Sequence, residues 1–259
     1  MRMMKKVLGT VTVLALSVSL LAGCGSTAVS PVSSTASTAA ESTTSSVVSE
    51  TTSAAADENA AAAAQLLNDL TGSYQELWPV ILADEYQQTW LDDCTALVGE
   101  ENAEAAFEKL SSMVTGDVYG EDAVEAYANG GGAYFCGFTN DLATLTFDGE
   151  TSTISGTDKD GNVLFSHTYH YIVMEPVHEL YEFESDDADS GEFTYFFLAP
   201  DTSAETYHIE FRYGSDAEAL SQYDTGEYAY WLASGISTDC DQTMIDNCIE
   251  LFCTENLAG

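Results

Sequence analysis

A change of sequence period after residue 132 constrains the fold of this chain more than any other feature. Beyond it, apolar and polar residues alternate in short segments, at 133–138, 142–147, 151–155, 163–174, 180–184, 192–198 and 206–213. Turn-forming pairs such as Asp148-Gly149 and Asp160-Gly161 separate these segments. Alternation puts every second side chain on one face of a strand, and short strands joined by tight turns favour an antiparallel meander closed into a barrel.

Helical patterns lie on both sides of the predicted strands. An alanine run at 60–64 favours the start of a helix, and apolar residues recur at helical spacing over 75–91 and 102–114. A shorter helix around 123–127 ends at the three glycines 130–132, and 216–222 and 243–252 are helical again. We therefore expect an α+β, mainly β fold: an antiparallel β-barrel with N-terminal and C-terminal helices.

The N-terminus has the pattern of an export signal. Arg2, Lys5 and Lys6 precede an apolar run over residues 7–21, and small residues then lead to Cys24. This ending resembles the bacterial lipobox, which implies cleavage before Cys24 and a lipid on its sulfur. The apolar run is short for a transmembrane helix, which needs about 20 residues, although an uncleaved membrane anchor is the alternative. Either way we expect the rest of the protein to lie outside the cytoplasm. The leading prediction is an exported protein, lipid-anchored through Cys24 to the outer face of the bacterial cell membrane.

The composition changes between this signal and the predicted domain. Residues 26–56 are almost wholly serine, threonine and alanine, without an aromatic residue. Such a segment cannot bury enough apolar surface to offset the entropy of ordering it. We predict a signal peptide at 1–23, a disordered tether at 24–60 and one barrel domain at 61–259.

Charge and motifs exclude several classes of function. Six lysines and arginines oppose 43 aspartates and glutamates, for a formal net charge of -37, so no basic surface exists to neutralise nucleic-acid phosphates. The 45% hydrophobic and 11% aromatic content is enough for a folded core. The sequence has no GxSxG, HExxH or phosphate-cradling loop, and we do not expect an enzyme.

The cysteines of the folded part are odd in number. They are Cys94, Cys136, Cys240, Cys248 and Cys253, none of them in a CxxC pair, which gives a cysteine-built zinc site weak support. An exported protein permits disulfides, and an odd count leaves at least one thiol unpaired or paired between chains. Our hypothesis is a local disulfide among the last three.

The histidines are the remaining residues with metal-binding chemistry. His167 and His170 lie three apart in a predicted strand and so face opposite sides, while His178 lies in a predicted turn. His208 differs, because Glu210 follows two residues later and shares its face of the strand. Imidazole and carboxylate both ligate zinc, but a His–Glu pair without a metal is the alternative.

Five motifs in a fixed order resemble the ZinT (YodA-like) metal-binding family. Ala199-Pro200 and a short loop precede HIEFRYGSD at 208–216, where the family has His-x-His and a Gly-x-Asp ending the strand. DLTGSYQELWP at 69–79 resembles the family's N-terminal Gly-x-Trp region, YEFE at 181–184 one of its barrel strands, and 224–231 its aromatic stretch. The resemblance spans residues 68–256. It implies an exported lipocalin-like barrel with added helices that binds zinc or cadmium through histidines at the barrel mouth.

The resemblance carries over only part of the family's site. His208 matches the first histidine of His-x-His, and Glu210 replaces the second with another ligand type. Phe196 stands where the family has a histidine and cannot ligate, and no histidine is present near 253–256, where its C-terminal histidines fall.

Three other residues are candidates to complete the metal site. They are Glu255, Cys253 and His178, whose positions relative to His208 and Glu210 the sequence does not fix. The leading hypothesis is a cell-surface lipoprotein that binds a divalent metal, zinc first, for buffering or delivery to a metal ABC transporter. The alternative is a metal-free, lipocalin-like module that binds a small ligand in a cup lined by tyrosines and phenylalanines.

Overall fold

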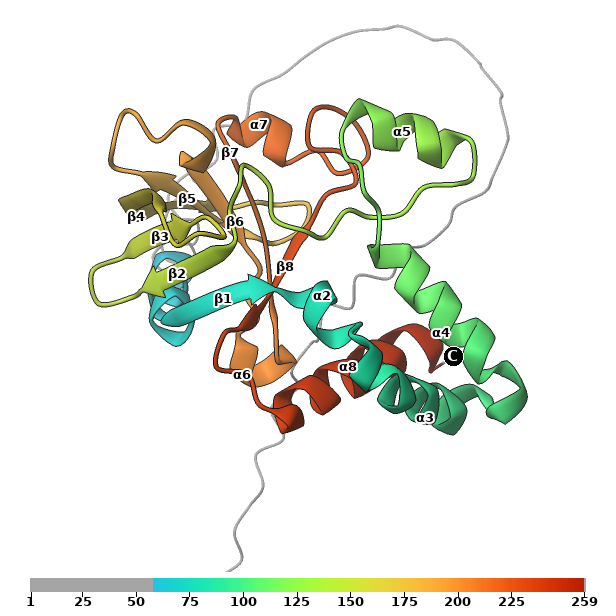
Figure 1. Ribbon diagram of the computed structural model, residues 1–259. Coiled ribbons are helices and arrows are strands. Elements are labelled where there is room, and N and C mark those ends of the chain that lie inside the picture. Colours follow the sequence, from blue (N-terminus) through green and yellow to red (C-terminus); the bar gives the residue numbers. More distant parts are fainter. Residues whose placement is uncertain (1–57, 259) are drawn as a thin grey trace, which may run out of the picture. The chain divides into compact units, whose positions relative to one another are not determined.

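The computed structural model describes residues 58–258 (Figure 1). The predicted signal peptide, the lipidation site Cys24 and nearly all of the predicted tether lie outside these residues. The helix expected from the alanine run covers 58–69, so the predicted boundary at 60/61 falls inside it. This helix is placed by Ala63, Leu66 and Leu67, which are buried in the barrel cluster. Among the helices of 58–258, none is long and apolar enough to cross a membrane.

Eight strands form a closed antiparallel barrel, and each pairs with the next along the chain. The first and last strands close it through Tyr74 opposite Ser237 and Gln75 opposite Ile236. This topology confirms the predicted fold class. The strands are β1 (Gly72–Glu76), β2 (Thr144–Asp148), β3 (Thr153–Thr157), β4 (Val163–Met174), β5 (Tyr181–Ser185), β6 (Tyr195–Leu198), β7 (Ile209–Gly214) and β8 (Ala233–Ser237).

The helices precede, follow and interrupt this series of strands. Two of the short ones are 3-10 helices, and the four-residue helices lie in the connections on either side of β7. The helices are α2 (Leu77–Ile81), η1 (Asp84–Tyr86), α3 (Gln87–Val98), α4 (Glu100–Val114), α5 (Glu121–Ala128), η2 (Gly191–Phe193), α6 (Ser203–Thr206), α7 (Ala217–Leu220) and α8 (Gln242–Leu257).

Two sequence predictions about secondary structure were wrong. The alternating segment 133–138 is not a barrel strand: it makes only single bridges, from Phe135 to Thr115 and to Trp231. Its alternation reflects packing of aromatic rings, as Phe135 stacks on Tyr119 with centroids 5.7 Å apart. The predicted helix at 75–91 is divided into the end of β1, α2, η1 and α3. Strands β1 and β8 were missed because their ladders with each other and with β2 and β7, not local periodicity, define them.

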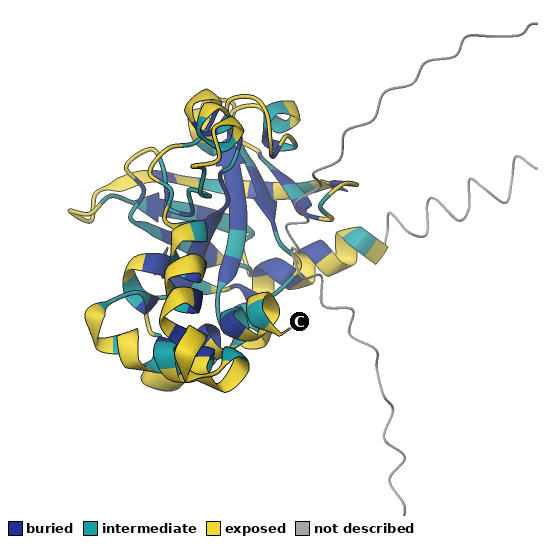
Figure 2. Cartoon of the chain, turned by 90° about the vertical axis from the view of Figure 1, so that its right-hand side faces the viewer, coloured by how far each residue is buried: buried dark blue, intermediate teal, exposed yellow. Residues whose placement is uncertain are grey.

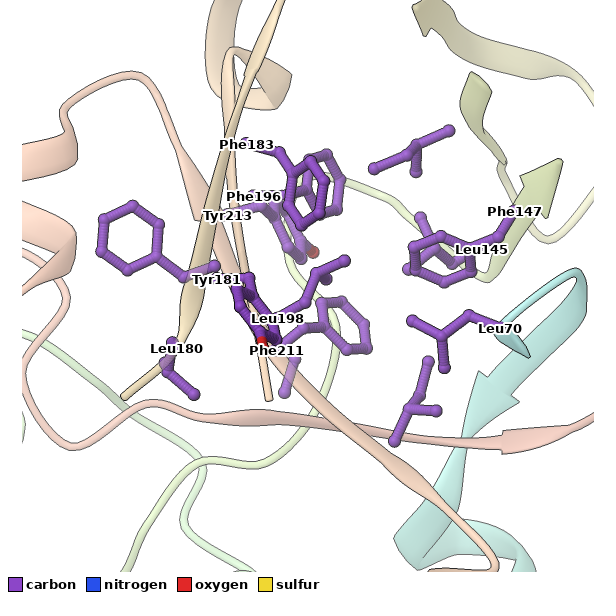
Figure 3. Close-up of a cluster of buried hydrophobic side chains, with 14 of the residues drawn as sticks. Leu70, Leu145, Phe147, Leu180, Tyr181, Phe183, Phe196, Leu198, Phe211 and Tyr213 are labelled. Atoms are coloured by element: carbon purple, nitrogen blue, oxygen red, sulfur yellow. The ribbon is translucent and has the colours of Figure 1, made fainter. Parts of the chain in front are cut away.

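Aromatic and aliphatic side chains fill the barrel (Figure 3). Phe196, Phe211 and Tyr213 are fully buried, and the ring centroids of Phe196 and Tyr213 lie 5.4 Å apart. The ring of Phe138, from the connection before β2, meets Phe211 with centroids 5.3 Å apart. The tyrosines and phenylalanines that the sequence offered as the lining of a ligand cup therefore pack against one another.

A second apolar cluster joins α2, α3, α4 and α8 to the outer face of β8. The fully buried Trp90 of α3 lies at its centre and donates its indole N–H to the carbonyl oxygen of Ile81 at 2.8 Å. Ile236 of β8 and Ile249 of α8 belong to the same cluster. In Figure 2 these helices show buried stripes beside exposed ones, as amphipathic helices on a core do.

Candidate metal-binding site

The predicted ligands lie on the outer side of β7. Ile209, Phe211 and Tyr213 belong to the cluster inside the barrel, so Glu210 on the same strand points the other way. His208, just before the strand, contacts Cys248 of α8. The two predicted ligands therefore lie between the barrel wall and α8. The resemblance to the ZinT family implied a barrel-mouth site, and this outward placement differs from that expectation.

A short local structure positions His208. Thr202 and Glu205 form a reciprocal capping box at the start of α6, and Tyr207 after it adopts a left-handed conformation with φ 67°. This residue turns the chain from α6 into β7. The backbone carbonyl of Thr206, at the end of α6, is left facing the imidazole of His208.

The hydrogen bonds of His208 define its tautomer. Its Nδ1 lies 2.7 Å from the carbonyl oxygen of Thr206, and because a carbonyl only accepts, Nδ1 carries the proton. The lone pair is then on Nε2, which lies 3.8 Å from Oε1 of Glu210. Histidines that bind metals typically donate the other ring N–H to a carbonyl or carboxylate. The side chains of His208 and Glu210 are 18% and 32% exposed, so an ion from solvent has access to them.

The separation of the two ligand atoms is close to that of a metal site. Two ligands about 2.0–2.2 Å from a tetrahedral zinc lie about 3.4 Å from each other. The separation of 3.8 Å between Nε2 of His208 and Oε1 of Glu210 exceeds this by a few tenths of an ångström. A small rotation of the glutamate side chain is enough to bring them to that spacing. Two side chains do not complete a zinc site, however, and within residues 58–258 no three His, Cys, Asp or Glu side chains stand close enough to hold a metal.

Two further carboxylates influence His208. Asp201, in the loop before α6, and Glu255, near the end of α8, both interact electrostatically with His208 and Glu210. Desolvation raises the pKa of each, and the charge of Glu210 raises it further, while His208 lowers it. Neighbouring carboxylates repel one another when they are charged, and a bound cation offsets this repulsion. Asp201, Glu210 and Glu255 therefore put negative charge within electrostatic range of the imidazole.

The protonation of His208 is perturbed by the same neighbours. Burial lowers its pKa, but the interactions with Cys248 and Glu210 outweigh burial and hold the pKa well above its usual value. The proton that is added at Nε2 takes the position that a metal ion would occupy. Sγ of Cys248 lies 3.8 Å from Nδ1, on the nitrogen that bonds Thr206, so the thiol does not face the lone pair on Nε2.

The structure separates the three candidate substitutes for the missing histidines. Glu255 is near His208, as described above. Cys253 instead meets Cys94, with their sulfur atoms 3.9 Å apart. His178 pairs with the buried Glu175 at 3.4 Å and its ring lies 3.6 Å from that of Tyr223. Only Glu255 of the three is available to the site.

Sequence reasoning missed Asp201 and gave Cys248 no role near His208. Asp201 directly follows the Ala199-Pro200 motif. Cys248 precedes Glu255 by seven residues in α8, a spacing that places both on one face of a helix. The seven-residue spacing predicts that the two residues share a helix face, but it does not predict which element that face contacts.

The other histidines of the barrel each have a carboxylate partner. Nδ1 of His167 lies 2.8 Å from Asp187, and Nδ1 of His170 lies 2.7 Å from Asp186. The side chain of His167 is 16% exposed and that of His170 is 51% exposed, as expected for opposite faces of β4. The two histidines do not share a site.

Two solved structures are similar to this chain. The Zn(II)-bound ZinT-like domain of Streptococcus pneumoniae AdcA aligns at 15% identity over 71% of this chain and 89% of that domain, with a TM-score of 0.45. Zn(II)-bound AdcA from Streptococcus pneumoniae aligns at 15% identity over 70% of this chain and 34% of that protein, with a TM-score of 0.42. No family model and no curated protein matches.

Proposed function

We propose that this chain is an exported lipoprotein that binds a divalent metal, zinc first, at His208 and Glu210. The observation that carries the proposal is the free Nε2 of His208 facing a carboxylate oxygen of Glu210 at 3.8 Å, with Nδ1 held by Thr206. An imidazole and a carboxylate suit zinc better than magnesium or calcium, which favour all-oxygen sites. Asp201 and Glu255 are the side chains best placed to complete the coordination after a rotamer change.

The electrostatics of the molecule support a cationic ligand. The chain has a formal net charge of -37, which concentrates cations near its surface. Salt screens this field beyond about 8–10 Å, so the bulk charge does not choose a metal, whereas the local donor set does.

The place and use of the bound metal follow from the N-terminal sequence. A lipid on Cys24 anchors the protein to the outer face of the membrane, and the serine-, threonine- and alanine-rich segment that follows acts as a tether for the barrel. A metal held by a few partly exposed ligands exchanges with its surroundings, which suits buffering or delivery to a metal ABC transporter. No further protein partner or nucleic acid is part of this proposal.

Calorimetric titration of the purified protein with zinc tests the site. His208→Ala is expected to weaken zinc binding at least tenfold, because it removes the nitrogen ligand, and Glu210→Gln to weaken it by a smaller factor. His170→Ala is the matched control, since it removes another histidine that contacts a carboxylate, in β4. Circular dichroism shows whether each variant is folded. Equal zinc affinity in folded His208→Ala and the parent protein contradicts this assignment.

The alternative, a metal-free module with a small organic ligand, has less support because aromatic rings occupy the barrel interior. Native mass spectrometry after growth in rich medium separates the two functions. A mass increment of a metal ion, removed by a chelator, supports metal binding. An organic adduct that resists chelation supports the alternative.

A further inference from the structure

Two thiols that lie far apart in the sequence meet between α3 and α8. Sγ of Cys94 and Sγ of Cys253 are 3.9 Å apart, across 159 residues of sequence. Both side chains are fully buried. The sequence favoured a local disulfide among Cys240, Cys248 and Cys253, but Cys253 has Cys94 as its sulfur neighbour.

The surroundings hold these two cysteines in place. Helices α3 and α8 pack along their lengths, and the ring of Trp90 meets that of Phe252 edge to face, with centroids 6.0 Å apart. Trp90 and Phe252 are each within four residues of one of the thiols, so the sulfur atoms stay opposed. A disulfide has an S–S distance of about 2.05 Å, which rotation of the two side chains can reach when the backbones already face each other.

We propose that Cys94 and Cys253 form a disulfide that ties the C-terminal helix α8 to α3. The inference rests on the export proposed above, because disulfides persist outside the cytoplasm. The two thiols lose two electrons and two protons as the S–S bond forms. A low-molecular-weight disulfide takes up both, and its own S–S bond is cleaved to give two thiols.

The order of events follows from the burial of the thiols. Both thiols are fully buried in the folded protein, so an oxidant in solution does not reach them. Thiolates are the reactive species in exchange. The bond therefore forms while the chain folds, before α8 has docked, and once formed it is shielded from reductants.

The disulfide also bears on the candidate metal site. Cys248, which contacts His208, and Glu255, which interacts with it electrostatically, lie on α8 on either side of Cys253. A covalent tie at Cys253 holds this helix against α3 and keeps Glu255 near the imidazole. Reduction leaves only noncovalent packing to do so.

Refolding with and without an oxidant tests the proposal on the purified protein. The protein is reduced and unfolded, then refolded in chelator with or without oxidised glutathione, and its free thiols are alkylated in denaturant. Peptide mass spectrometry is expected to find a Cys94–Cys253 cross-link only after oxidation. Cys240→Ala should keep this cross-link, whereas Cys94→Ala should lose it. A cross-link between Cys240 and Cys248 instead, or both Cys94 and Cys253 alkylated after oxidation, overturns the proposal.

A thermal measurement gives a second readout. Oxidised protein should melt roughly 5–15 °C higher than reduced protein, since the bond closes a long loop of the unfolded chain. No difference should appear in the Cys94→Ala variant. Chelator is present throughout, so this result does not depend on whether the protein binds zinc. Refolding in solution is likewise independent of export. The same alkylation is done on protein taken from the cell surface. If both thiols are alkylated there although the purified protein forms the bond, the protein has no such disulfide in the cell.

Discussion

The buried hydroxyl of Tyr213 provides a sharp test of how the barrel holds its longest connection. Tyr213 is fully buried inside the barrel on β7. Its Oη accepts the backbone N–H of Thr139 at 2.6 Å and donates to the carbonyl oxygen of Thr139 at 2.9 Å. Thr139 lies in the connection between α5 and β2, which has no ladder with a barrel strand over residues 133–143. One side chain therefore bonds both backbone groups of a residue outside the sheet, and it is the partner of the N–H of Thr139.

Tyr213→Phe removes this hydroxyl and keeps the ring. A buried polar group left without its partner costs about 1–3 kcal/mol. The N–H of Thr139 loses its partner in this variant, whereas the carbonyl of Thr139 keeps the N–H of Leu142 at 3.1 Å. Since Thr139 is only partly buried, water recovers some of it, and we expect a loss of about 2 kcal/mol in the free energy of unfolding. For a domain of this size that is roughly 4–8 °C in Tm.

Urea denaturation and thermal melts followed by circular dichroism measure the effect. Tyr181→Phe is the matched control, because Tyr181 is also buried in the barrel cluster and its hydroxyl makes no hydrogen bond to any residue of 58–258. We expect a change below about 0.5 kcal/mol for that variant. If Tyr213→Phe is as mild as Tyr181→Phe, the hydroxyl does not fasten the connection and the reasoning fails.

Two further outcomes follow from the structure. Zinc affinity should fall about tenfold per unit of pH once pH drops below the raised pKa of His208, because a proton and the metal compete for Nε2. Calorimetry between pH 7.5 and 5.5 measures this, and constant affinity would mean that carboxylates alone hold the metal. Gly149→Ala should destabilise the protein by about 1–3 kcal/mol, because its Cβ would lie 2.4 Å from the backbone Cα of Asn68. Gly131→Ala, where a Cβ meets nothing within 4 Å, should be near neutral in the same melts.

The local patterns of the sequence predicted most of the barrel. Strand β4 has the predicted bounds 163–174, and β2, β3, β5, β6 and β7 overlap their predicted segments. Alternation is a property of neighbouring residues, and it reveals a half-buried strand whatever the strand pairs with. The same locality explains why His208 and Glu210 share a face: a spacing of two residues fixes that relation within one strand.

Local sequence patterns did not predict which strands pair to close the barrel. Strand β1 ends where α2 begins, and the register of Tyr74 opposite Ser237 joins segments more than 150 residues apart. The apolar residues after Trp78 recur at helical spacing. The sequence shows no separate alternation of apolar and polar residues for the strand before it. Pairing with β2 on one side and β8 on the other defines it as a strand.

The sequence by itself determined that this chain is a barrel with flanking helices and that His208 and Glu210 form a pair. Only the tertiary structure decided that the pair faces α8, that Asp201 and Glu255 complete its surroundings, and that Cys253 meets Cys94. The physical reason is the range of the interactions. Backbone geometry fixes the faces of one strand or helix, whereas the contacts between elements depend on strand register and helix packing across the whole chain.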